Sequence, residues 1–137
     1  MKKIITTFFL ALVINNATAQ TLDTLNYLRT FEQQKAQYIG QPFSVLLNAM
    51  NQVQFVSVRG GRNIRNKTQI PYCSFYFVNR PNMFTYGAIK FVIEWQTPIP
   101  LVNINYYTNR NTYYFTNEEQ QFYGSKTIKD IKVFVNP

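Results

Sequence analysis

Hydrophobic residues near the start of the chain recur every third position, a spacing that is typical of an amphipathic helix. The periodic positions are Leu22, Leu25, Leu28 and Phe31. Thr21 or Asp23 supplies an N-terminal cap, and Gly40 follows as a stop signal. The pattern therefore predicts a first helix over residues 21–36.

A second, shorter helix is predicted from Pro42 to Met50, because proline is tolerated at the first position of a helix. Apolar side chains follow at i, i+3, i+4 and i+7, where they share one helical face: Phe43, Leu46, Leu47 and Met50. The segment Tyr38 to Phe43 predicts a tight corner between the two helices.

Beyond the second helix the pattern changes to that of β-strands. Alternation is clearest over Ile89–Trp95, where one face is wholly apolar and the other is mixed, as in an antiparallel sheet with one covered side. We expect Pro98 and Pro100 to end this strand. Further strands are predicted at Gln52–Val58, Ile70–Val78 and Ile128–Val135.

Residues 102–115 are predicted to form an additional β-hairpin. Val102, Ile104 and Tyr106 alternate with asparagines, as in a strand with one apolar face. The polar run at 108–111 is typical of a turn, after which the chain is expected to pair back on itself.

The order of elements predicts an α+β fold for a single domain over residues 20–137. Thr116 and Glu119 have the spacing of a capping box, which predicts a helical turn through Phe122 before the last strand. We expect two N-terminal helices to pack on one face of an antiparallel sheet of about five or six strands.

Residues 1–19 have the pattern of a secretory signal peptide. Two lysines precede the apolar stretch Ile4–Ile14, and Ala17-Thr18-Ala19 provides the small-residue ending. The apolar stretch is shorter than the ~20 residues that a spanning helix needs. We therefore expect cleavage before Gln20 and export to the periplasm or the extracellular space, with no integral membrane segment left after signal removal.

The composition excludes several kinds of chemistry. The chain has no His and a single Cys, Cys73, so it lacks the residues for Ser-His or Cys-His catalysis, for most zinc sites and for an intramolecular disulfide. No metal or cofactor is expected.

The chain is basic. Lys and Arg number 14 against 6 Asp and Glu, and loss of Lys2 and Lys3 lowers the net charge from +8 to +6. This balance favours an anionic envelope component as partner, while nucleic acid is not specifically indicated.

Two helices followed by a meander resemble, in element order, the small envelope proteins of the outer-membrane assembly lipoprotein class. The lipobox cysteine of that class is absent from this sequence. The corner Tyr38–Phe43 and the ending Lys129–Val133 are also similar to those of small exported bacterial proteins of unassigned function. Neither resemblance carries a catalytic motif.

A basic, glycine-containing segment between two predicted strands is the candidate ligand-binding loop. Its four cations lie within nine residues, at Arg59, Arg62, Arg65 and Lys67. Arginine presents a planar donor fork to phosphate or sulfate, and glycine lets backbone amides approach an anion. The alternative is a solvated connection whose charge keeps a sheet edge soluble.

We hypothesise a small exported, non-catalytic binding protein of the cell envelope or extracellular space, which docks an anionic ligand through this loop. An alternative is an inhibitor or immunity-type protein that binds another exported protein. A third is a carboxylate-based hydrolase using Glu94 and Asp130, although each carboxylate is more simply a cross-strand partner of Lys or Arg. Cys73 is expected to be a small buried hydrophobe.

Overall fold

The computed structural model describes residues 23–137. Its helices are α1 (Thr24–Gln33), α2 (Phe43–Ala49), α3 (Leu101–Asn111) and α4 (Asn117–Gly124), with 3-10 turns η1 (Lys35–Gln37) and η2 (Arg80–Asn82). Its strands are β1 (Ser57–Gly60), β2 (Gln69–Tyr76), β3 (Ile89–Pro100) and β4 (Ile128–Val135). The predicted signal peptide, the cleavage site before Gln20 and the predicted helix start at Thr21 lie outside the described residues. Within 23–137, no helix has the length and apolar character needed to cross a bilayer.

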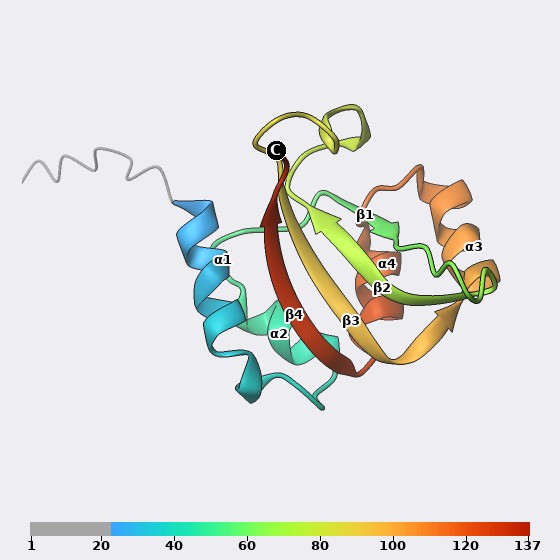
Figure 1. The fold of residues 1–137 in the computed structure, drawn as a ribbon, viewed down its shortest axis with the longest axis horizontal. Coiled ribbons are helices and arrows are strands. Elements are labelled where there is room, and N and C mark those ends of the chain that lie inside the picture. Colours follow the sequence, from blue (N-terminus) through green and yellow to red (C-terminus); the bar gives the residue numbers. More distant parts are fainter. Residues whose placement is uncertain (1–22) are drawn as a thin grey trace, which may run out of the picture.

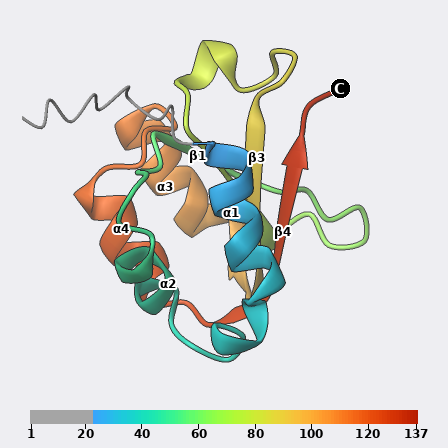
Figure 2. The same cartoon turned by 90° about the vertical axis from the view of Figure 1, so that its left-hand side faces the viewer.

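The strands form one antiparallel sheet in the order β1-β2-β3-β4, so that neighbours in the chain are also neighbours in the sheet. Figure 1 shows the sheet running across the front of the molecule. Figure 2 shows the helices gathered on one side of it, while the loop between β1 and β2 projects from the other side. The described residues therefore form a two-layer α+β fold, with four strands where five or six were predicted.

The helix-facing side of the sheet carries an aromatic core. Phe75 of β2 and Phe91, Ile93 and Trp95 of β3 are buried, as the alternation over Ile89–Trp95 predicts. The ring of Phe43 from α2 packs on this layer, with centroids 4.9 Å from Phe75 and 5.5 Å from Trp95. Aromatic rings of this size contribute much of the apolar area that folding removes from water. The apolar face of β3 is therefore the centre of the core.

Both edges of the sheet are partly covered by the chain itself. At the β4 edge, a carboxylate oxygen of Glu32 in α1 accepts a hydrogen bond from the backbone N–H of Val133 (3.1 Å), and Gly40 donates to the carbonyl of Ile128 (2.8 Å). At the β1 edge, the N–H of Val58 donates to the carbonyl of Tyr113 (2.9 Å). Unpaired edges recruit additional strands. These contacts occupy some of the edge groups that an added strand would need.

The hairpin predicted for residues 102–115 is wrong, because the segment contains helix α3. Val102 and Tyr106 would share a strand face with Ile104, but they are 71% and 57% exposed whereas Ile104 is buried. In the sheet, β2 and β3 already have two neighbours each, and Tyr113 occupies the β1 edge. A helix satisfies its own backbone hydrogen bonds, so it needs no free edge.

Several strand boundaries also differ from the prediction. β3 continues through Pro98 to Pro100, because beyond Trp95 it no longer pairs with β4 and needs no ladder donor on that side. β1 begins later than the predicted range 52–58 and extends through Arg59 to Gly60, so the candidate binding loop, residues 59–67, starts inside a strand.

The helix start predicted from Thr116 and Glu119 is confirmed. The side-chain oxygen of Thr116 accepts a hydrogen bond from the N–H of Glu118 (3.2 Å), and the carboxylate of Glu119 accepts one from the N–H of Thr116 (2.9 Å). The capping box satisfies backbone donors that the first turn of α4 leaves unpaired.

Candidate functional site

The sheet face opposite the helices presents three rows of side chains that run across the strands. The rows follow from the strand register, together with the N–H of Gly61, which donates to the carbonyl of Tyr72 (2.8 Å). From β1 to β4 they are Ser57, Tyr76, Lys90 and Phe134, then Arg59, Ser74, Val92 and Lys132, then Gly61, Tyr72, Glu94 and Asp130. The small side chains of Ser74 and Val92 occupy the middle of the central row, which makes this face concave.

A groove of about 530 Å³ lies over these rows, and we call it the outer trough. Its basic side chains come from β1, the following loop, β3 and β4, namely Arg59, Arg62, Lys90 and Lys132. Its aromatic side chains are Tyr72, Tyr76, Phe84 and Phe134. Cations and aromatic rings therefore alternate around a floor of small residues.

Two of the trough cations lie over aromatic rings. The guanidinium carbon of Arg59 is 5.0 Å from the ring centroid of Phe84, and the ammonium of Lys90 is 5.4 Å from that of Phe134. Such cation–π contacts favour a defined position of the charged group, which loses little of its hydration. Arg59 and Lys90 are thus held along the trough walls.

Most of the trough charge is not neutralised by acidic neighbours. Five ion pairs occur among residues 23–137, and none of them involves Arg59, Arg62 or Lys90. Lys132 lies 3.8 Å from a carboxylate oxygen of Asp130, which is itself held at 2.7 Å by Lys35. The trough therefore has a positive potential that is available to an anion.

Gly61 allows the binding loop to leave β1 close against the trough wall. A Cβ atom at this position would lie 2.2 Å from ring carbons of Tyr72, so any side chain would displace that ring. The glycine pair, interpreted from the sequence as room for an anion, thus also has a packing role.

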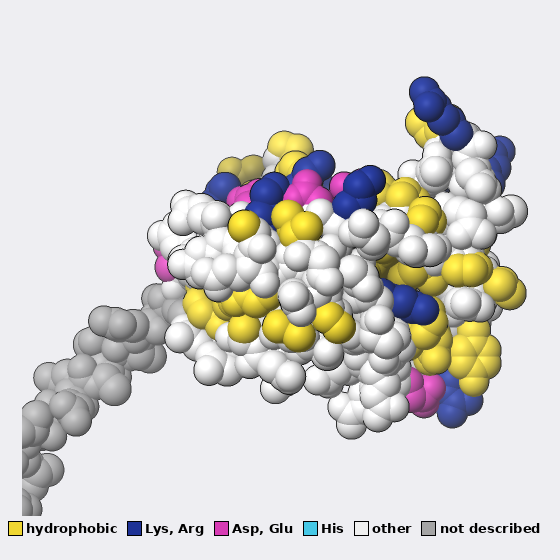
Figure 3. All heavy atoms as spheres, turned by 90° about the horizontal axis from the view of Figure 1, so that it is seen from below, with side chains coloured by type: hydrophobic (Ala, Val, Ile, Leu, Met, Phe, Trp, Pro, Cys, Tyr) yellow, Lys and Arg dark blue, Asp and Glu magenta, His cyan; other side chains and the backbone are white. Residues whose placement is uncertain are grey.

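Figure 3 shows mixed acidic and basic side chains along one side of the molecule and basic side chains at the tip of a separate projection.

The four predicted loop residues do not form a single cluster. Arg59 and Arg62 line the outer trough and also a second cavity, of about 570 Å³, between the loop and α3. Lys67 lines only that second cavity, and Arg65 lines neither. The loop therefore separates two concave surfaces and contributes cations to both.

Lys90 and Lys132 were not predicted as site residues, although both lie on the more polar face of a predicted strand. Their relation to Arg59 depends on the pairing of four strands, since Ser74 pairs with Arg59 and Val92, and Val92 pairs with Lys132. The alternation within each strand indicates on which sheet face Lys90 and Lys132 lie. The sequence does not indicate the register between strands, which determines their neighbours on that face.

The carboxylates considered for hydrolysis lie opposite each other in the register of β3 and β4. Glu94 pairs with Lys129 (3.3 Å). Burial opposes ionisation of Asp130, but hydrogen bonds from Lys35 and the N–H of Ile131 outweigh it, so the pKa of Asp130 is lowered. A general acid needs a raised pKa. Asp130 is therefore poorly suited to donate a proton.

Cys73 is buried in the core, as expected for a small hydrophobe. The indole N–H of Trp95 points to its sulfur at 3.4 Å. Burial raises the pKa of the Cys73 thiol to about 12, so the thiolate needed for nucleophilic chemistry does not form near neutral pH.

Within the described part of the chain, no group of three or more Cys, Asp or Glu side chains is placed to hold a metal ion. Comparison of the sequence and fold with protein-family models, curated proteins and solved structures found no match.

Proposed function

We propose that this is an exported, non-catalytic binding protein that docks an extended anionic polymer of the cell envelope, an acidic glycan, in the outer trough. The observation that carries the proposal is the set of four cations on the open sheet face, three of which have no acidic partner among residues 23–137. Exposed uncompensated charge attracts polyanions and accelerates their association.

The spacing of the cations favours an extended ligand over a small anion. Arg59 and Lys132 stand at opposite ends of one cross-strand row, three strand intervals apart. At ~4.8 Å per interval, this separation is about 14 Å. A chain with a charge on successive units matches this separation better than a single phosphate or sulfate does.

The aromatic side chains favour a sugar backbone as the carrier of that charge. Phe84, from the segment between β2 and β3, and Phe134 of β4 line the trough with 64% and 46% of their surface exposed, and Tyr72 lines it beside them. Apolar ring faces beside polar donors bury the carbon-bearing face of a ligand while its charged groups stay hydrogen-bonded.

The test is affinity for heparin as a model acidic glycan, measured by calorimetry over a series of salt concentrations. We expect Lys90→Ser/Lys132→Ser to weaken binding by about tenfold, since exposed charge pairs contribute up to ~1 kcal/mol each. The slope of log K against log salt should fall by about 1 for each lost cation.

Two arginines of one loop provide a matched control. Arg62 lines the trough and Arg65 does not, although both are exposed. Arg62→Ser should therefore weaken binding more than Arg65→Ser, at equal net charge. Equal effects of the two variants, or no salt-sensitive binding by the wild type, would refute the proposal.

Export is part of the proposal and has its own measurement. Intact-mass analysis of protein recovered from periplasmic or culture fractions is expected to show a chain beginning at Gln20. Recovery of only the uncleaved chain, in membranes, would contradict it.

A second candidate function, binding to another exported protein, is favoured by α3. Val102 and Tyr106 are four residues apart on this helix and strongly exposed, which is the spacing of anchors that enter a groove on a partner. Capture of a partner that is lost in Val102→Ser/Tyr106→Ser but retained in Lys90→Ser/Lys132→Ser would favour this function over the first.

A further inference from the structure

The cavity between the binding loop and α3 has an apolar floor. Ile70 at the start of β2 and Ile104 of α3 are buried beneath it, and Leu101 is half-buried beside them. Gly60 brings the backbone close to this floor, since a Cβ there would lie 3.3 Å from methyl carbons of both isoleucines. The volume of about 570 Å³ falls within the ~300–1,000 Å³ of small-molecule pockets.

One aliphatic side chain that lines the cavity is exposed to solvent. Ile64 projects from the binding loop, lines the cavity and is 93% exposed. An isoleucine in this position gains the transfer free energy of its side chain only when another apolar group covers it. The floor and the loop therefore offer apolar surface from two sides.

The rim of the cavity is basic. Arg59, Arg62 and Lys67 line it, and no Asp or Glu does. Asn63 and Asn105 add neutral polar groups. An apolar floor with a cationic, carboxylate-free rim is complementary to a molecule with one hydrocarbon chain and one anionic head.

We propose that this cavity binds a single-chain alkyl carboxylate, a medium-chain fatty acid, with its chain along Ile70, Ile104 and Ile64 and its carboxylate at Arg62 and Lys67. Arginine binds a carboxylate through a planar pair of donors, and lysine adds a point charge. This site goes beyond the proposed glycan function, because α3 and Lys67 take no part in the outer trough.

The test is calorimetric titration of the whole mature protein with octanoate, decanoate and dodecanoate below their micelle-forming concentrations. Burial of each added methylene should tighten binding by about fourfold. Decyltrimethylammonium, which has a similar chain and the opposite charge, should bind at least tenfold more weakly than decanoate. Affinity that does not rise with chain length, or equal binding of the cationic amphiphile, would overturn the proposal.

Two tryptophan variants on α3 distinguish a blocked cavity from a general effect of the substitution on the helix. Asn105 lines the cavity and Asn103 does not, and both are exposed on the same helix. Asn105→Trp should abolish decanoate binding, whereas Asn103→Trp should leave it unchanged. Equal behaviour of the two tryptophan variants would refute the location.

The charged variants separate this site from the glycan site. Lys67→Ser should weaken decanoate binding several-fold with heparin binding little changed, and Lys90→Ser should do the reverse. Loss of both activities in both variants would mean that neither site is distinct and would overturn the fatty-acid proposal. Decanoate binding without heparin binding would refute only the glycan proposal.

Discussion

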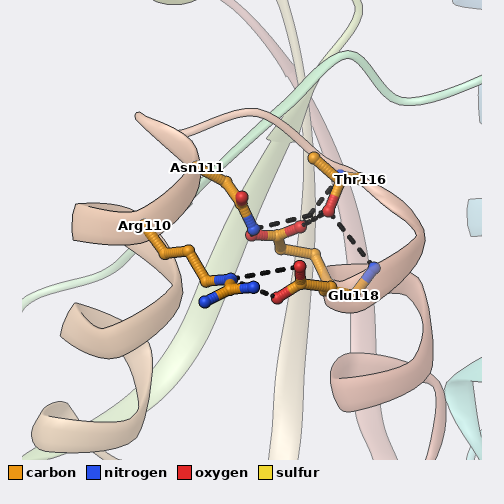
Figure 4. A network of polar contacts seen from close by, with 5 residues as sticks. Arg110, Asn111, Thr116 and Glu118 are labelled. Carbon is orange, nitrogen blue, oxygen red and sulfur yellow. Dashed lines mark hydrogen bonds and ion pairs between the residues drawn. The ribbon is translucent and has the colours of Figure 1, made fainter.

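Replacement of Glu119 by alanine tests how α3 and α4 are joined. The Glu119 side chain is 1% exposed, and its carboxylate accepts hydrogen bonds from the side-chain amide of Asn111 (2.6 Å), from the N–H of Thr116 (2.9 Å) and from the Thr116 hydroxyl. Figure 4 shows Asn111, at the end of α3, directed toward Thr116, at the start of α4. The Glu119 carboxylate thus links the end of α3 to the start of α4.

The expected loss follows from these contacts. Hydrogen bonds to a charged group contribute ~1.5–3 kcal/mol each, but Asn111 and Thr116 are only partly buried and regain water when the carboxylate is removed. Removal also relieves the cost of burying the charge itself. Since loss of a cap alone costs ~0.5–2 kcal/mol, we expect Glu119→Ala to lower the free energy of unfolding by about 2–3 kcal/mol.

The neighbouring glutamate is the control. Glu118 pairs with Arg110 at 2.9 Å, but both side chains are about half exposed. Both glutamates lie in the first turn of α4, so their favourable interaction with the helix dipole is similar. Exposed pairs contribute little to stability, and Glu118→Ala is expected to have a much smaller effect than Glu119→Ala.

Urea denaturation followed by the fluorescence of Trp95, the single tryptophan, measures both variants. With a slope of ~1–3 kcal/mol per molar urea, Glu119→Ala should lower the midpoint by about 0.7–3 M. Equal shifts for the two alanine variants would refute the argument, because burial would then not distinguish the two carboxylates.

Three further predictions concern the core and the β4 edge. Leu46→Ala should cost ~2–5 kcal/mol, as for other fully buried leucines, and its half-buried neighbour Leu47→Ala less; equal urea midpoints for the two would mean that α2 packs differently. Because the pKa of Asp130 is lowered on folding, its contribution is present above the ordinary pKa of 3.8 and is lost as pH falls through the folded-state value. Urea midpoints of wild type and Asp130→Asn should therefore differ at neutral pH and converge in strong acid, and a constant difference would contradict this. Cys73 should react with a thiol reagent only in urea, and rapid reaction of the native protein would contradict its burial.

Local sequence signals were sufficient where one element carries all the information. The capping box of α4 needs only Thr116 and Glu119 at the right spacing, and the apolar face of β3 needs only the alternation over Ile89–Trp95. The spacing did not reveal that Glu119 is buried while Glu118 is not. Nor did it reveal the hydrogen bond to Glu119 from Asn111, which α3 brings to the capping box.

The segment after Pro100 shows where such signals fail. The alternation of Val102, Ile104 and Tyr106 fits a strand, and the same residues also fit a helix that buries Ile104 alone. Tertiary packing decides between the two, since part of the β1 edge is taken by Tyr113, which follows the helix. Backbone groups that find no partner in a neighbouring strand form their hydrogen bonds within a helix instead.

By itself, the sequence determined the α+β class, the basic balance, the absence of histidine chemistry and the presence of a cationic loop after the first strand. Only the tertiary structure decided which cations act together. Register places Lys90 and Lys132 on the same sheet face as Arg59, whereas Arg65 lies in the loop after β1 and lines neither concave surface. The physical reason is that strand alternation fixes the face of each side chain, while the neighbours on that face come from strands far apart in the chain.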